Sequence, residues 1–135
     1  MTPTRLGLVY AITLPIFFAI DLVWIGVVAR GFYRKHLGHL LSADVNWPAA
    51  ILFYLVFIAG IVFFAVKPAL EAGSAGRALA SGAFLGFLAY ATYDLTNQAT
   101  MRDWPVVVTV VDLAWGTVLT SLVAFLSYQA SSRVL

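Results

Sequence analysis

Three aspartates, Asp21, Asp94 and Asp112, lie within long apolar segments of this chain. Asp21 and Asp112 are each followed three residues later by a tryptophan, Trp24 and Trp115, so on a helix each carboxylate shares a face with an indole. The same apolar segments contain no Lys, Arg or His. Carboxylates without a basic partner bind a proton, a metal cation or an organic cation, and aromatic rings add cation–π attraction for the organic one.

A ladder of small residues leads to the second of these aspartates. Along a helix over residues 78–97, every fourth position falls on one face. These positions are Ala78, Gly82, Gly86, Tyr90 and Asp94. Glycines four apart allow close approach of another helix, and an ionisable group needs water or a partner rather than hydrocarbon. The ladder therefore predicts a face that packs inside a helix bundle.

Asp21 and Asp112 are expected about 10–12 Å below the same membrane face, from the helical rise of about 1.5 Å per residue. Each costs about 2.5–3.5 kcal/mol to insert in a bilayer, which favours a functional pocket. The candidate ligand- or proton-binding residues are Asp21, Trp24, Tyr54, Tyr90, Asp94, Asn97, Asp112 and Trp115. The alternative is that the aspartates stay protonated and donate hydrogen bonds between helices, with no ligand.

The composition places the chain in a membrane. Of its 135 residues 62% are hydrophobic and 10% charged, too little polar surface to cover a soluble globule. The net charge of +2 comes from scattered basic residues that form no phosphate-binding patch, which excludes nucleic acid as a partner. No cysteine and no cofactor motif is present, and the pair His36 and His39 is too small a ligand set, so we expect neither a cofactor nor a metal.

Hydropathy and breaker residues predict an all-α, polytopic membrane protein, a four-transmembrane-helix bundle forming one membrane domain over residues 1–135. The expected spans are residues 6–29, 48–66, 78–97 and 105–128, and Lys67-Pro68 is expected to end the second. Residues 31–42 are expected to form an amphipathic interfacial helix between the first two spans. Four crossings place both termini on one side. They also leave four Lys and Arg residues on each side, so the positive-inside rule gives no orientation.

Three sequence motifs carry a resemblance to a known family. YATYDLTNQAT spans residues 90–100, DWP spans 103–105, and VDLAWGT spans 111–117. With Asp21-Leu22, Trp47-Pro48 and Tyr54, they make the chain similar to an uncharacterised bacterial family of small integral membrane proteins of unknown function. The resemblance implies a four-helix, multi-pass protein of the inner (cytoplasmic) membrane and assigns no catalytic residue.

Three functions remain open on the sequence. Proton- or cation-coupled transport of a small organic solute is favoured, because empty anionic groups occur without a positioned nucleophile. A homodimer is expected in that case, since four helices hardly enclose a transport path. Carboxylates acting as acid and base would instead suit a lipid- or isoprenoid-modifying enzyme. The third hypothesis is a structural or accessory subunit. The expected partners are the bilayer and a small cationic or lipid-like ligand.

Overall fold

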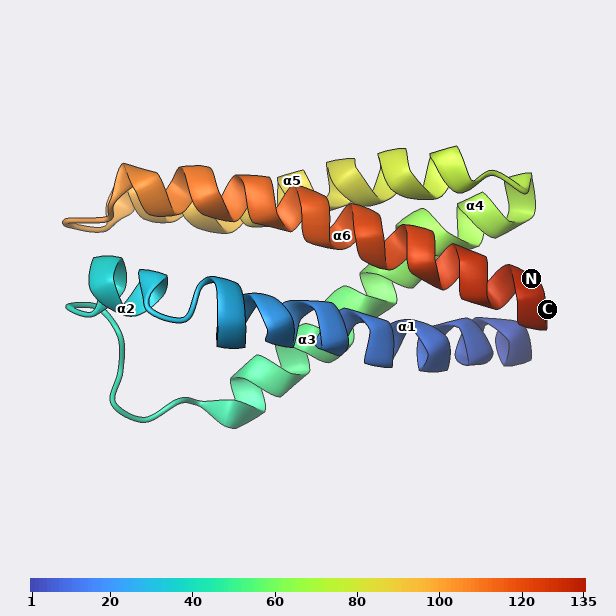
Figure 1. The fold of residues 1–135 in the computed structure, drawn as a ribbon, viewed down its shortest axis with the longest axis horizontal. Helices are drawn as coiled ribbons and strands as arrows, with labels where there is room; N and C mark the ends of the chain where they lie inside the picture. The colour runs from blue at the N-terminus through green and yellow to red at the C-terminus, as the bar shows by residue number, and fades with distance from the viewer.

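The computed structural model describes all residues from 1 to 135 and consists of helices joined by short connections. Figure 1 shows an elongated bundle in which α1 runs beside the long helix α6, α3 crosses them obliquely, and both termini lie at one end. The elements are α1 (Pro3–Val23), the π-helical turn η1 (Trp24–Val28), α2 (Phe32–Leu37), α3 (Trp47–Ile61), the π-helical turn η2 (Val62–Val66), α4 (Lys67–Ala72), α5 (Ala75–Thr100) and α6 (Val106–Val134).

Local sequence signals set where these helices begin and end. The side chains of Thr2, Asn46 and Ser74 each accept a hydrogen bond from a backbone N–H in the first turn of α1, α3 and α5. Gly73 ends α4 in the left-handed conformation, with φ of 61°, which glycine adopts without steric cost. The sharp reversal between α4 and α5 follows from this glycine and the serine cap directly after it.

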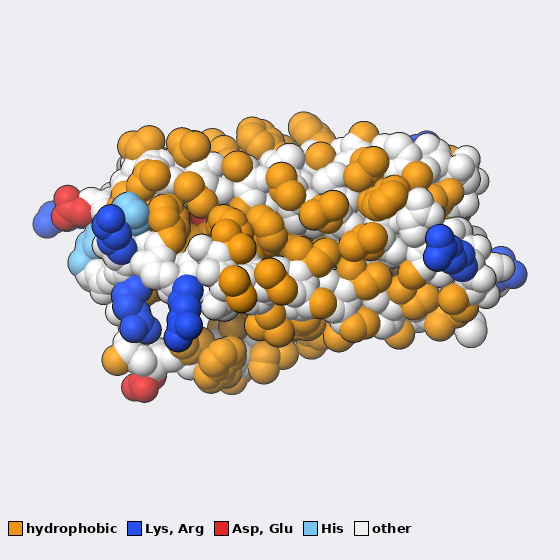
Figure 2. Space-filling model, in the orientation of Figure 1, with side chains coloured by type: hydrophobic (Ala, Val, Ile, Leu, Met, Phe, Trp, Pro, Cys, Tyr) orange, Lys and Arg blue, Asp and Glu red, His pale blue; other side chains and the backbone are white.

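Three helical stretches are long and apolar enough to cross a membrane: 3–28, 47–72 and 106–134. Figure 2 shows hydrophobic side chains covering the middle of the molecule and charged side chains at its two ends. The expected all-α membrane protein is therefore confirmed. Helix α5 is 26 residues long but rich in Ala, Gly and Thr, which lowers its hydropathy. It connects the end of the bundle where α4 stops with the opposite end where α6 starts (Figure 1), and its crossing stays a prediction.

Two expected boundaries are wrong. Lys67-Pro68 does not end the second span, because α4 continues through the proline to Ala72. The π-helical turn η2 precedes it, and the Lys67 N–H bonds to the Val62 carbonyl. The interfacial helix expected over 31–42 forms only over Phe32–Leu37. The amides of Leu40 and Leu41 both bond to the Leu37 carbonyl, at 2.8 and 3.0 Å, and this turn stops the helix.

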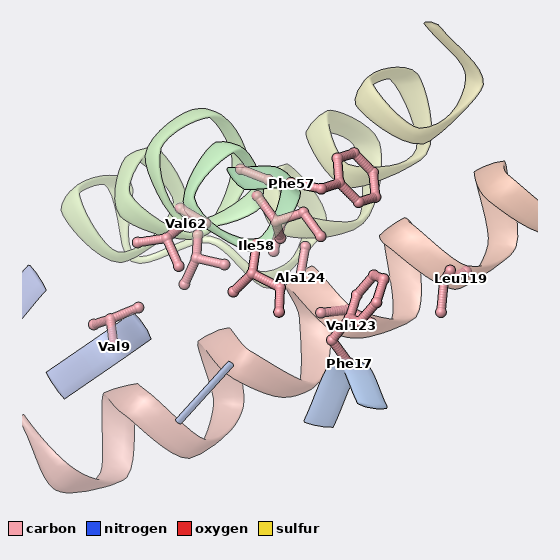
Figure 3. Packing of buried hydrophobic residues seen from close by; sticks show 13 residues of the cluster. Val9, Phe17, Phe57, Ile58, Val62, Leu119, Val123 and Ala124 are labelled. Atoms are coloured by element: carbon pink, nitrogen blue, oxygen red, sulfur yellow. The ribbon is translucent and has the colours of Figure 1, made fainter. Parts of the chain in front are cut away.

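A cluster of buried apolar side chains holds α1, α3 and α6 together. Phe17 of α1, Ile58 of α3 and Leu119 of α6 are almost completely buried, and Figure 3 shows side chains of the three helices pointing toward one another. Aromatic rings extend the cluster, with the Phe17 ring 5.7 Å from that of Tyr54. This packing fixes the positions of the helices that carry Asp21 and Asp112.

Helices α5 and α6 approach to backbone contact. A Cβ on Gly86 would lie 2.0 Å from the Gly116 carbonyl oxygen, and a Cβ on Gly116 would lie 2.3 Å from the Tyr90 ring. Gly82 faces Thr120 in the same way. The two helices are therefore antiparallel here: a step of four residues toward the end of α5 corresponds to a step of four residues toward the start of α6. The ladder of small residues is the contact face, as the sequence predicts.

Candidate acidic site under aromatic side chains

The register of α5 and α6 brings two aspartates to one level. Gly86 lies opposite Thr120, and one turn further along α5 Tyr90 lies opposite Gly116. The next turn places Asp94 opposite Asp112, and the two carboxyl groups lie side by side. Asp94 is fully buried, and neither of its carboxyl oxygens has a hydrogen-bond partner. Leaving a buried carboxyl group without a hydrogen-bond donor costs free energy.

Asp112 is covered by a tyrosine from the connection after α1. The Tyr33 hydroxyl donates a hydrogen bond to Asp112 Oδ1 at 2.6 Å and accepts one from Trp24 Nε1 at 3.2 Å. Burial raises the pKa of Tyr33, and the bond to Asp112 raises it further. The phenol therefore keeps its proton as a donor to Asp112. Helix α2, which carries Tyr33, folds back onto the end of the bundle, where its Leu37 packs with Trp104.

Asp21 is held by the other tryptophan. Trp115 Nε1 donates to Asp21 Oδ1 at 3.4 Å, and Tyr54 lies next to the same carboxyl group. The rings of Trp24 and Trp115 stack in parallel, with centroids 4.3 Å apart and planes 8° apart. Each indole thus serves the aspartate of the opposite helix, Trp115 directly and Trp24 through Tyr33. The stack joins η1, directly after α1, to α6.

No basic side chain neutralises this cluster. The single ion pair in the structure joins the Met1 amino group to Glu71, 3.9 Å apart at the end that holds the termini. No three His, Cys, Asp or Glu side chains gather as a metal site would require. His36 and His39 instead contact the backbone oxygens of Phe32 and Asp103. The acidic site therefore consists of carboxyl groups, one phenol and two indoles.

The structure brings most of the predicted site residues together. Asp94 and Asp112 lie side by side, and Asp21 is linked to them through the stacked rings of Trp115 and Trp24 and the hydroxyl of Tyr33. Tyr90 packs between α5 and α6 at Gly116, and Tyr54 lies beside Asp21. Asn97 is the exception. It lies half-buried on α5 beside Tyr93 and makes no hydrogen bond to any of the carboxyl groups.

Sequence reasoning missed Tyr33 and a second polar network. Tyr33 looks like part of the apolar face of an interfacial helix, and its hydroxyl was the only signal of another role. In the second network, Trp104 Nε1 donates to Thr109 Oγ1 at 3.1 Å, and that hydroxyl donates to Gln98 Oε1 at 2.8 Å. The network ties the turn between α5 and α6, which keeps Asp94 and Asp112 in register.

Fold and site together define an all-helical membrane protein with a buried acidic cluster beneath aromatic side chains. The chain belongs to the family described as "Predicted membrane protein (DUF2177)", which matches residues 6–129. This confirms the resemblance found in the sequence to a membrane protein family of unknown function. No curated protein and no solved structure matches the chain.

Proposed function

We propose that this protein is a multi-pass protein of the inner (cytoplasmic) membrane that exchanges protons for a small organic cation at the carboxyl groups of Asp94 and Asp112. The observation that carries the proposal is the fully buried Asp94, whose two oxygens are unpartnered beside a second carboxyl group. Four crossings are part of the proposal, because α5 must run between opposite ends of the bundle to connect α4 with α6 (Figure 1).

Two neighbouring carboxyl groups without a cation repel each other when both are ionised. A proton held by the pair removes the repulsion, and so does an organic cation that takes the place of the proton. Asp112 is the better anchor because Tyr33 already donates to its Oδ1. Asp94 has no such donor, so it is the member that binds and releases the proton. Binding of the cation and the proton is then mutually exclusive, which is the requirement for exchange.

Aromatic side chains supply the second element of the site. Trp24 and Trp115 turn their N–H edges toward Tyr33 and Asp21, and the outer faces of the stacked rings can attract an organic cation, worth about 2 kcal/mol when desolvated. Tyr33 sits on a short helix between two connections, so its displacement leaves the long helices in place. The same cluster therefore contains a proton site, a cation-binding wall and an aromatic cover.

The test uses vesicles that contain the purified protein and a trapped pH-sensitive dye. With an acidic interior, external benzyltrimethylammonium should enter in exchange for protons and raise the internal pH. Asp94→Asn and Asp112→Asn should each abolish this signal, since an amide binds no proton in this range. The matched control is Asp103→Asn, the same change at an exposed turn residue whose φ of 57° asparagine also tolerates. It should respond like the wild type.

Two outcomes would contradict the proposal. Wild-type vesicles could respond no faster than protein-free vesicles, or Asp112→Asn could exchange protons as fast as the wild type. Thermal unfolding in detergent, compared among the four proteins, separates lost exchange from lost folding. The organic cation needs no fluorescent label, because the trapped dye reports protons alone.

A lipid- or isoprenoid-modifying reaction is the second candidate. It is favoured by an apolar groove of about 320 Å³ that adjoins the stacked tryptophans, and the carboxyl groups behind them would act as acid and base. The lipid profile of cells lacking the protein distinguishes this function from exchange. An accumulated lipid precursor that Asp94→Asn fails to clear would support it, whereas an unchanged profile removes it.

A further inference from the structure

A groove on the outside of the bundle lies directly against the stacked tryptophans. It has a volume of about 320 Å³, and every residue that lines it is hydrophobic. The lining residues are Ala19, Ile20, Val23, Trp24, Val28 and Trp115. Ligand pockets run from about 300 to 1,000 Å³, so this groove is sized for the apolar part of a small ligand.

The groove faces the hydrocarbon of the membrane. It lies between α1 and α6, which are both apolar enough to span a bilayer. Val23 and Val28 at its edge are 56% and 66% exposed, so in a membrane they contact lipid tails. Trp24 and Val28 both belong to the π-helical turn η1, whose wider hydrogen bonding runs from the Ala29 N–H to the Trp24 carbonyl at 2.7 Å. A ligand reaches this surface sideways, from within the bilayer.

The tryptophan stack separates this apolar groove from the acidic cluster. The rings of Trp24 and Trp115 line the groove with carbon atoms, while their N–H groups bond inward to Tyr33 and Asp21. Apolar surface and anionic groups thus meet across one pair of stacked rings. A ligand that suits both sides has an apolar body and a positive charge, and no basic side chain of the protein competes for the carboxylates.

We propose that this groove is the docking site where an amphipathic organic cation enters from the hydrocarbon layer, with its apolar body in the groove and its charge directed at the tryptophan stack and Asp21. This inference rests on the exchange function proposed above and names the class of its substrate. The charge complementarity selects a cation over a neutral lipid chain, which would find the same apolar walls but gain nothing from the carboxylates.

Binding of three probes to the detergent-solubilised protein tests this proposal by equilibrium dialysis against protein-free micelles. Tetraphenylphosphonium and tetraphenylborate have nearly the same apolar shape and opposite charge, and tetramethylammonium has the charge without the body. Tetraphenylphosphonium should bind saturably. The other two should bind at least about tenfold more weakly, a difference of about 1.4 kcal/mol.

Substitutions then locate the site. Ala19→Phe fills the groove from an exposed position and should weaken tetraphenylphosphonium binding about tenfold, equivalent to about 55 Å² of apolar ligand surface left uncovered. Ala59→Phe makes the same change at an exposed position on α3 and should leave binding unchanged. Val23→Trp repeats the test from a second lining position, and thermal unfolding shows that each variant is folded.

The proposal is overturned if tetraphenylborate binds as tightly as tetraphenylphosphonium, which would mark a site for lipid chains. It is also overturned if Ala19→Phe and Val23→Trp both bind like the wild type. Proton exchange driven by benzyltrimethylammonium in vesicles distinguishes failure of the docking site from failure of the exchange function. If that exchange persists while the groove tests fail, only the docking site is wrong. If both fail, the exchange function is wrong as well.

Discussion

Substitution of Gly86 by alanine tests the register on which the acidic site depends. The added Cβ would lie 2.0 Å from the Gly116 carbonyl oxygen, and ordinary contact begins at 3.4 Å, so α5 and α6 must separate locally by about 1.4 Å. Overpacking of this kind costs about 1–3 kcal/mol. Alanine regains about 1 kcal/mol through its higher helix propensity. A backbone carbonyl cannot rotate away as a side chain does, so we expect the cost to exceed the gain.

Gly60→Ala is the matched control, because a Cβ on Gly60 meets no atom within 4 Å. Thermal unfolding in detergent, followed by tryptophan fluorescence, should give a lower Tm for Gly86→Ala and an unchanged or higher Tm for Gly60→Ala. The separation also moves Asp94 away from Asp112, so proton exchange should slow in Gly86→Ala alone. Equal Tm values for the two variants would refute the backbone contact between α5 and α6 and the register derived from it.

The other predictions concern the aromatic cover and the turn. Tyr33→Phe leaves Asp112 without its donor and should destabilise the protein by about 1–3 kcal/mol in detergent unfolding, whereas Tyr128→Phe, which loses no hydrogen bond, should not. The raised pKa of Tyr33 gives a stabilisation that is complete below the ordinary value of 10.0 and declines as pH rises above it; stability measured across this range should fall less in Tyr33→Phe than in the wild type. The stacked indoles should give an exciton couplet in circular dichroism that disappears in Trp24→Phe and persists in Trp47→Phe, whose exposed ring has no such partner; a couplet unchanged by Trp24→Phe would contradict the stack. Thr109→Val breaks the chain from Trp104 to Gln98 and should cost about 1–3 kcal/mol, while Thr117→Val, which loses only a bond to Leu113 of its own helix, should cost less.

The close-packing face of α5 was predictable because its small residues recur at every fourth position. Small residues at every fourth position on 78–97 favour close packing against another helix, and the structure places that face against α6. The span ending at Lys67-Pro68 was predicted wrongly, because a proline after a charged residue usually stops a helix, whereas here the π-helical turn η2 precedes it. The predicted length of the interfacial helix was also wrong, because the helix ends in a local turn at Leu37 although the amphipathic pattern continues.

The partners of the aspartates could not be predicted from spacing. Asp21 and Trp24 share a face of one helix, as do Asp112 and Trp115, and this spacing suggests pairs within a helix. In the structure Trp115 bonds to Asp21 of α1, and Trp24 is connected to Asp112 of α6 through Tyr33. The two rings stack between η1 and α6. Tyr33 was missed because its role depends on α2 folding back over the bundle. These contacts depend on how separate helices pack together, and the sequence of one segment does not reveal that packing.

Both termini lie at the end of the bundle away from α2 (Figure 1). A flexible linker from Leu135 of one copy to Met1 of a second therefore joins two copies that point the same way, and an inverted pair would need an extra crossing in the linker. A tandem fusion in which only one half carries Asp112→Asn then reports whether same-direction copies share the work. Half of the exchange activity of the unsubstituted fusion marks two independent units, and activity well below half marks copies that act together.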